Sequence, residues 1–468
     1  MKISRMVLAS YALTALFALS VPSYAFEKPK TMDDMWKIIQ AQQQEIEAMK
    51  AQMKSSPVSD QPPVADAAPS SVKKLERKTD VLSQEVEKLR TNLAIPEEAK
   101  YKSAYGLGPA ASKVYQVGRG LSIGGYGEGF YQANVGDKGN EKDKADLERG
   151  VLYIGYKFTD SILFNSEIEF EHASSGEGAE LKGEVGIEFA SLDFFIDPIA
   201  NARAGLVLMP MGLVNRIHEP LFYFGNHRPE VEQRIIPSTW REMGAGLFGS
   251  ITPNLTYTAY VVNGLDAKGF SSDGIAEGRG GGSNANAENF GYVARMDYTP
   301  DVLPGLTVGG SAYVGNAGQN QNFAGHKANV FTQLYDMHLQ WRYRGLEWRA
   351  LGSWGHINNA DLLSAEKGET IGSESYGWYT EVGYDILPLL MPTTTQYLAP
   401  FFRYEHSDTI AKAPNGFADD KTKDWQIFQV GLQYKPIPNV VLKADYRNFV
   451  AKQGLLADDF NLGFGFIF

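Results

Sequence analysis

The sequence contains no cysteine, which excludes disulfides, thiol nucleophiles and thiolate metal sites. Its seven histidines are scattered, and neither HExxH nor GxSxG occurs, so the common motifs of zinc proteases and serine hydrolases are absent. Beyond the N-terminal 21 residues, no stretch has the ~18 uninterrupted apolar residues of a transmembrane helix. Any residence in a membrane would therefore depend on β-strands.

Positive charge is also scarce, and the net charge of -11 argues against a nucleic-acid partner. The chain has 48 Gly, 24 Tyr and 25 Phe, yet its mean hydropathy is only -0.27. This combination favours a wall whose side chains alternate between lipid and water. We expect no cofactor and no resident metal.

The N-terminus has the pattern of a secretory signal peptide. Lys2 and Arg5 precede an apolar run over residues 6–21, which small residues at positions 23 and 25 follow. We predict a signal peptide over residues 1–25, cleaved after Ala25, and export across the inner membrane.

Residues 26–95 show heptad spacing in two stretches, with apolar residues at the a and d positions. A linker rich in Pro, Ala and Ser over residues 55–71 separates the two stretches. The pattern predicts a short periplasmic α-helical coiled coil that associates with other copies of the chain. A single amphipathic helix lying on the barrel or on a membrane is the alternative. We expect residues 96–118 to form a second linker.

Residues 119–468 consist of period-2 segments of about ten residues, which alternate between short turns and long polar loops. Clear examples of the segments are residues 147–158, 161–172, 346–356 and 440–450. The long loops are expected at residues 136–146, 263–288, 357–374 and 407–423. The sequence therefore predicts an all-β protein, a transmembrane antiparallel β-barrel of about sixteen strands.

The last segment, residues 460–468, carries a large apolar residue at every second position up to Phe468. A strand that ends the chain on an aromatic residue resembles the recognition signal of the barrel assembly machinery. We therefore expect the outer membrane of a Gram-negative bacterium, with outer-membrane lipid around the barrel and the N-terminal segment in the periplasm. The Gly-rich residues 124–129 open no helix, so we expect them to bend the first strand rather than to bind a nucleotide.

Strand parity assigns charges to the lumen, because residues that alternate with lipid-facing ones point inward. The predicted acidic wall consists of Glu167, Glu169, Glu171, Glu184 and Glu188, with Lys182 beside them. The predicted opposite wall, richer in base, consists of His338, Arg342, Arg349, Arg403, Lys443 and Arg447. Two such walls could set up a transverse field across the channel. Alternatively, the charges pair across neighbouring strands, as in Glu347 with Arg349, Arg403 with Glu405, or Asp445 with Arg447.

One long loop, about residues 210–239, is unusually rich in apolar and aromatic residues. Folding back into the barrel would bury these residues and expose the charged ones to the channel. The predicted pore constriction consists of Arg216, His218, Glu219, His227, Arg228, Glu230, Glu232 and Arg234. A subunit contact or a lid over the mouth is the alternative.

The same loop carries a family resemblance. Residues 218–220 (HEP), 228–230 (RPE), 235–240 (IIPSTW) and 244–246 (GAG), together with Glu242, resemble the phosphate-selective porin O and P family. The resemblance implies a trimeric sixteen-stranded porin with infolded loops. A coiled coil ahead of such a barrel is also similar to the DcaP-like porins, which take up dicarboxylates. The loop departs from the Arg and Lys ladder of phosphate-selective members, because it holds four Arg against four Glu when Arg241 and Glu242 are included.

These patterns predict an outer-membrane porin, a water-filled channel for passive uptake of small charged solutes such as phosphate or dicarboxylates. We expect no enzymatic activity. The alternatives are an outer-membrane barrel enzyme of the phospholipase or protease type, and a structural or adhesive barrel assembled through its coiled coil. Sixteen strands enclose a wider space than wall side chains alone can fill, which favours the channel.

Overall fold

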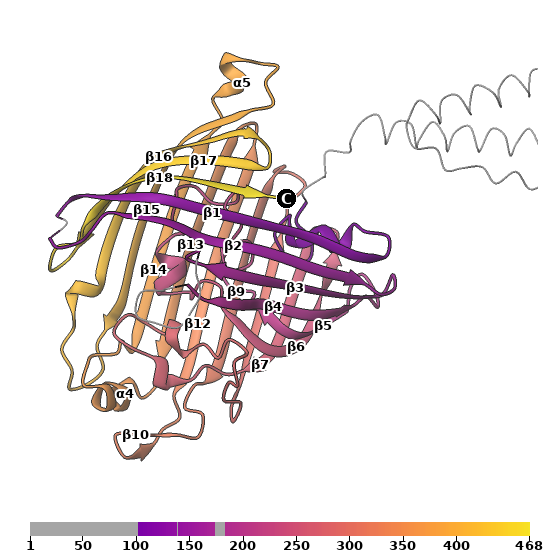
Figure 1. Cartoon of the computed structure of the whole chain (residues 1–468). Coiled ribbons are helices and arrows are strands. Elements are labelled where there is room, and N and C mark those ends of the chain that lie inside the picture. Colours follow the sequence, from indigo (N-terminus) through magenta and orange to yellow (C-terminus); the bar gives the residue numbers. More distant parts are fainter. Residues whose placement is uncertain (1–101, 138, 174–182) are drawn as a thin grey trace, which may run out of the picture. The chain divides into compact units, whose positions relative to one another are not determined.

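The structure is a computed structural model that describes residues 102–137, 139–173 and 183–468. Within these ranges, sixteen antiparallel strands close into one barrel, where each strand pairs with the next and β1 pairs with β18 (Figure 1). This confirms the predicted all-β barrel. The predicted signal peptide, both heptad stretches, the linker at 55–71 and Lys182 lie outside the described residues.

The barrel strands have the following bounds: β1 (Gly120–Gly136), β2 (Lys144–Lys157), β3 (Ile162–Glu171), β4 (Val185–Phe194), β5 (Asn201–Leu208), β6 (Arg241–Thr252), β7 (Leu255–Asn263), β8 (Phe290–Tyr298), β9 (Leu306–Asn316), β12 (Phe331–Tyr343), β13 (Leu346–Ile357), β14 (Glu374–Tyr384), β15 (Tyr397–Lys412), β16 (Asp424–Ile437), β17 (Val440–Ala451) and β18 (Asp458–Ile467). Two further strands, β10 (Asn322–Phe323) and β11 (His326–Lys327), form a hairpin in one loop.

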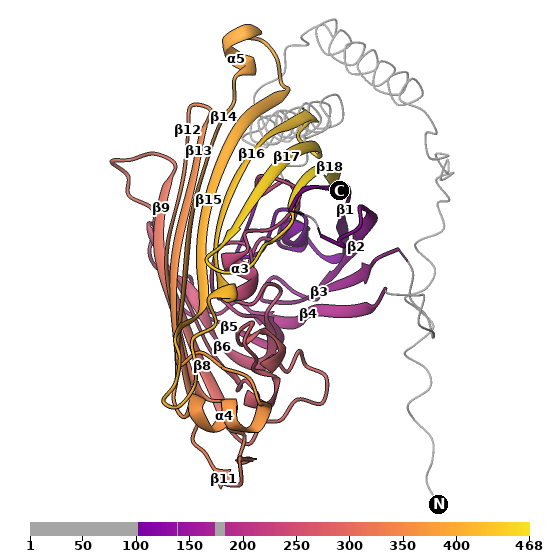
Figure 2. The same cartoon turned by 90° about the vertical axis from the view of Figure 1, so that its left-hand side faces the viewer.

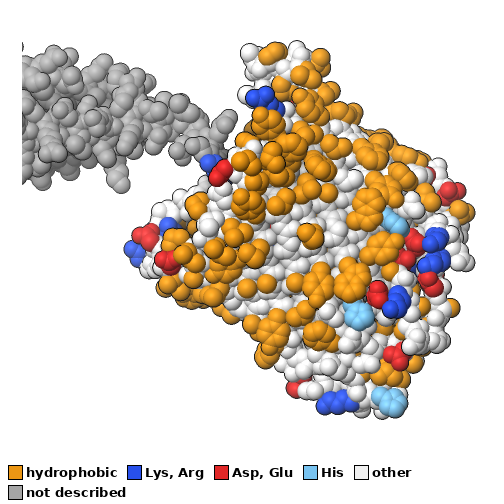
Figure 3. Space-filling model, turned by 180° about the vertical axis from the view of Figure 1, so that it is seen from behind, with side chains coloured by type: hydrophobic (Ala, Val, Ile, Leu, Met, Phe, Trp, Pro, Cys, Tyr) orange, Lys and Arg blue, Asp and Glu red, His pale blue; other side chains and the backbone are white. Residues whose placement is uncertain are grey.

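The strands form because their apolar and polar residues alternate. In β3, Glu167 and Glu169 are buried inside the barrel, whereas Ile168 is half-buried and Phe170 is exposed on the outside. Other strands repeat this parity, and the outer wall is covered mainly by apolar side chains (Figure 3). Burying that surface in lipid would contribute roughly 25 cal/mol per Å².

The seam between β1 and β18 depends on glycine. Tyr126 stands opposite Ile467, and Gly125 exchanges two backbone hydrogen bonds with Phe468. A Cβ at Gly125 would lie 2.7 Å from the Phe468 ring, and one at Gly127 would lie 2.7 Å from the Phe466 ring. The aromatic rings of the closing strand therefore cover the glycines of the first strand. Residues 126–129 pair regularly with β18, whereas the pairing of β1 with β2 shifts register between Glu128 and Phe130.

The connections differ between the two ends of the barrel. Short turns such as Arg344–Gly345 lie at one end, together with the longer connection that carries α5 (Leu387–Leu390). The long loops, including α4 (Ala360–Lys367) and the β10–β11 hairpin, lie at the other end (Figure 1). The loop expected at 407–423 is shorter, because β15 extends to Lys412 and pairs there with Glu374.

Residues 102–118, which we name the pre-barrel segment, contain a turn and the 3-10 helix η1 (Ala111–Tyr115). We expected a linker over residues 96–118. The described part instead packs against the barrel, because Leu107, Ala110 and Val114 are buried among wall residues. The apolar pattern of this segment is too short for the sequence to predict the packing.

Residues 209–240, which we name the inner loop, connect β5 to β6 and fold into the barrel, where α3 (Val231–Arg234) lies inside the wall (Figure 2). Val231, Ile236 and Trp240 are fully buried in a core that wall residues such as Tyr379 complete. A Cβ at Gly383 of β14 would lie 2.4 Å from the Phe224 ring, so glycine lets the loop approach the wall.

Among the described residues, no helix combines the length and the apolar composition that crossing a membrane requires.

Candidate functional site

The inner loop is attached to the wall of β15–β17 through its own backbone. Arg403 donates to the carbonyl oxygens of Phe224 and His227 at 2.5 and 3.2 Å. Lys443 donates to the carbonyl of Tyr223 at 3.3 Å, and the Asn226 N–H donates to a carboxylate of this wall. Arg403 and Lys443 of the wall thus donate hydrogen bonds to carbonyl groups of the inner loop. These bonds fix the path of the loop across the lumen.

A buried carboxylate holds the two halves of the inner loop together. Glu232 accepts hydrogen bonds from the N–H groups of Leu213 and Val214 at 2.8 and 2.7 Å, and from the Tyr379 hydroxyl at 2.7 Å. Burial raises the pKa of Glu232, although these three donors oppose the shift. Glu232 therefore acts as an internal brace of the loop, out of contact with solvent.

The inner loop also reaches the wall of β1–β3. His218 Nε2 lies 3.0 Å from a carboxylate oxygen of Glu167, and the Tyr223 hydroxyl donates to Glu128 at 2.6 Å. The loop thus touches both sides of the barrel, which places it as a partition within the lumen.

The pre-barrel segment meets the inner loop at the short-turn end. Glu219 accepts hydrogen bonds from the N–H groups of Ala110 and Ala111 at 2.9 and 3.3 Å, and Arg216 donates to the Gly106 carbonyl at 3.3 Å. Burial raises the pKa of Glu219 to about 8, against the effect of the two N–H donors. Residues separated by about a hundred positions are thereby joined across the opening of the barrel.

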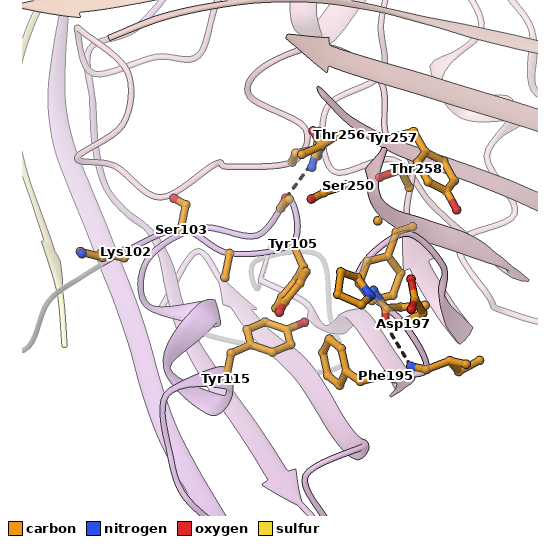
Figure 4. Close-up of a pocket in the computed structure, with 18 of the residues that line it drawn as sticks. Lys102, Ser103, Tyr105, Tyr115, Phe195, Asp197, Ser250, Thr256, Tyr257 and Thr258 are labelled. Atoms are coloured by element: carbon orange, nitrogen blue, oxygen red, sulfur yellow. Dashed lines mark hydrogen bonds between the residues drawn. The ribbon is translucent and has the colours of Figure 1, made fainter. Parts of the chain in front are cut away.

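A cavity of about 930 Å³ lies beside this junction, between the pre-barrel segment and the connections of β4 to β7 (Figure 4). Tyr105, Tyr115 and Phe195 bring their rings together on one side, with centroids 4.8 and 5.1 Å from that of Tyr105. Arg216 also lines the cavity and pairs with Asp297 at 3.1 Å. The cavity is therefore lined by aromatic rings together with one paired guanidinium.

The carboxylates on the inner face of β1–β4 form what we name the acidic wall. It consists of Glu128, Glu148, Glu167, Glu169, Glu171 and Glu188. Arg149 lies among them, 3.2 Å from Glu128 and 3.3 Å from Glu169, and Arg241 of β6 lies 2.6 Å from Glu188. Carboxylates thus outnumber guanidiniums on this side.

On the opposite wall, the charges pair both within a strand and across neighbouring strands. Arg349 contacts Glu381 at 2.5 Å and Glu347 at 3.1 Å, and Arg403 contacts Glu381 at 2.8 Å and Glu405 at 3.7 Å. Two of the three expected pairs therefore form. The third does not, because Arg447 pairs with Asp459 and Glu230, at 2.6 and 3.2 Å, in place of Asp445. Of the two alternatives, a transverse field or local pairing, the charges of this wall show local pairing, since buried cations need close counter-charges.

His338 belongs to a buried cluster on β8 and β12. Its Nδ1 lies 2.7 Å from Asp336 and its Nε2 lies 2.9 Å from Asp297. The Ser311 hydroxyl donates its hydrogen bond to the Asp336 carboxylate and not to the His338 imidazole. A serine nucleophile needs the imidazole as its base. The cluster instead anchors the inner loop, whose Gly212 N–H donates to Asp336 at 3.1 Å.

The remaining predicted site residues are distributed as follows. Arg228 and Arg234 are buried, Glu230 and His227 are half-buried, and Arg342 and Glu184 are exposed. Glu184 lies ahead of β4, at the rim rather than on the wall, because the strand begins at Val185.

Sequence reasoning missed several charged residues that the barrel brings into the lumen, such as Glu128, Arg149, Arg203 and Asp297. These residues occupy inward-facing positions in β1, β2, β5 and β8, and the alternation of apolar and polar residues could have identified them. Gly-rich stretches and strand irregularities interrupt that alternation in the sequence. Arg203 pairs with Asp193 at 2.6 Å beside the aromatic cluster. Among the described residues, no group of three or more His, Asp or Glu side chains is arranged to hold a metal ion.

Comparisons with known proteins place these features in context. No family model matches the chain. A protein of Aquifex aeolicus (strain VF5), described as uncharacterized, is 40% identical over 372 residues, which cover 77% of this chain and 82% of that protein.

Among solved structures, OmpF of Salmonella typhi in a complex with daunomycin is 13% identical, with a TM-score of 0.51 over 75% of this chain and 98% of that one. The channel DcaP of Acinetobacter baumannii is 14% identical, with a TM-score of 0.46 over 74% of this chain and 97% of that one. The likeness to OmpF concerns the fold alone.

Proposed function

We propose that this chain, which belongs to the same family as the Aquifex aeolicus protein, is an outer-membrane porin, because it folds as a closed barrel similar to that of OmpF. One observation carries the proposal, which is the inner loop folded into the lumen and attached to the surrounding wall. A loop in this place narrows a wide barrel to a selective passage. A barrel with only a structural role has no need of such a partition.

We propose further that the channel admits small charged solutes by passive diffusion, with phosphate or dicarboxylates as candidates from the family resemblance. Among the predicted constriction residues, Arg216, His227 and Glu230 are half-buried and would meet a solute, whereas His218, Glu219, Arg228, Glu232 and Arg234 are buried. The equal numbers of Arg and Glu among the predicted constriction residues are compatible with a porin, but they do not favour selectivity for phosphate. The lipid-facing apolar wall supports the outer membrane as the location, and the strand that ends at Phe468 supports assembly by the barrel assembly machinery.

Purified protein reconstituted into planar lipid bilayers is expected to produce stepwise ionic currents, because water that passes the inner loop conducts ions. The measurement is single-channel conductance in KCl. Heat-modifiable migration on gels verifies that the inserted protein is folded. A folded barrel that never conducts would contradict the porin proposal and favour a structural role.

The heptad stretches suggest that the N-terminal segment holds a trimer together. Deletion of residues 26–94 is expected to convert trimers into monomers, as measured by light scattering of the detergent-solubilised protein. Deletion of the linker alone, residues 55–71, is the matched control and should leave trimers intact. If trimers persist after the longer deletion, the barrel wall itself forms the subunit interface.

A further inference from the structure

Buried polar atoms without a protein partner gather on one side of the lumen. Among the described residues, side chains with such an atom on β1–β4, on the inner loop or at the start of β6 are Tyr126, Asn165, Glu188, Glu219, Arg228 and Arg241. Arg149 instead forms ion pairs with Glu128 and Glu169. The rest of the barrel contributes only Asn289, Gln321, Arg349 and Gln433. Because an unsatisfied buried polar group costs about 1–3 kcal/mol, so many donors and acceptors together indicate a region built for water or solute.

Arg228 illustrates the contrast with the opposite wall. Its side chain is buried and donates from one nitrogen to the Ser238 hydroxyl at 2.8 Å, while Nε and the other terminal nitrogen have no protein partner. Arg403, across the lumen, instead uses its nitrogens on loop carbonyls, Gln429 and Glu381. Most polar groups of β15–β17 that meet the inner loop are therefore hydrogen-bonded to it, whereas the unpartnered groups of the loop face the acidic wall.

The charge on this side of the lumen is negative. The acidic wall supplies six carboxylates, and the guanidiniums of Arg149, Arg228 and Arg241 are the cations among them. A narrow, low-dielectric passage lined by one sign of charge concentrates ions of the opposite sign. Rings of Asp and Glu are the usual means by which channels favour cations.

We infer that solutes cross the barrel between the inner loop and the acidic wall, and that this passage selects cations and small amine-bearing solutes. The inference rests on the proposed porin function, and it names cations as the solute class in place of the phosphate or dicarboxylates that the family resemblance suggests. The three guanidiniums keep the carboxylates apart and the passage hydrated. Anionic solutes would meet an excess of carboxylate along the whole wall.

The test is the reversal potential of the reconstituted full chain under a KCl gradient, repeated with methylammonium chloride. The wild type is expected to favour the cation in both salts. Glu128→Gln and Glu169→Gln together should lower the cation-to-anion permeability ratio several-fold, because they neutralise two wall carboxylates with little change in shape. The matched control is Glu405→Gln, which neutralises a buried carboxylate behind the inner loop, where the amide can still accept from the Val231 N–H.

The outcomes separate the two proposals. If the folded wild type carries no current, the porin function fails. If it conducts but favours chloride, or if Glu405→Gln changes selectivity as much as the acidic-wall variant, the passage along the acidic wall is refuted. Folding of each variant is verified by heat-modifiable migration, and Glu169→Gln alone serves if the double variant does not fold.

Discussion

Replacing Arg403 with alanine is expected to lower the free energy of unfolding by about 3–5 kcal/mol, the usual loss when one partner of a buried ion pair is removed. The Arg403 side chain is 1% exposed and contacts Glu381, Glu405 and Gln429, besides two loop carbonyls. Its removal would leave Glu405 without its cation and would free the inner loop from the wall. We therefore also expect larger and noisier single-channel currents.

The measurement is urea unfolding in lipid vesicles, followed by tryptophan fluorescence. Arg342→Ala is the matched control, because this arginine side chain is 49% exposed and pairs with Glu347 at 3.2 Å. Its loss should change stability by only about 0–1 kcal/mol, as for exposed ion pairs. Equal losses in the two variants would mean that Arg403 does not hold the loop.

The pre-barrel segment is expected to leave its place as the pH rises from 6 to 9, because Glu219 must then ionise while buried. Its pKa of about 8 lies above the ordinary value, so the docked state has its full stability below the ordinary pKa. That stability falls as the pH rises through about 8. Glu167, His218 and Tyr153 are the titratable groups that face or adjoin Glu219, and the Glu167 charge raises its pKa further.

Cysteine labelling measures this release, because the chain has no cysteine of its own. Ala110→Cys introduces one thiol at a buried position beside Glu219. Its labelling should become several-fold faster at pH 9 than in a Glu219→Gln background, where the neutral amide can still accept from the two N–H groups. The comparison at equal pH removes the pH dependence of the thiol itself. Identical rates in both backgrounds would rule out Glu219 as the pH-sensitive contact.

Much of the barrel follows from local pattern. The alternation in β3 predicts which residues point inward, because successive side chains in a strand lie on opposite faces whatever the strand pairs with. The same reasoning applies to residues 346–356 and 440–450, which form β13 and β17. The apolar content of residues 210–239 suggested burial, and those residues lie in the inner loop inside the barrel.

The sequence by itself thus determined that the chain forms a barrel of about sixteen strands with one loop unlike the others, because periodicity and composition are local properties. Only the tertiary structure decided which charges meet. Arg403 and Phe224 are 179 residues apart, and Glu219 and Ala110 are 109 residues apart. Such partners are chosen by strand tilt and register, and a bulge that reverses parity in one strand changes them. The sequence indicated the pairs of Arg349 with Glu347 and of Arg403 with Glu405. It carried no signal for the pairs of these arginines with Glu381 or for the docking of the pre-barrel segment.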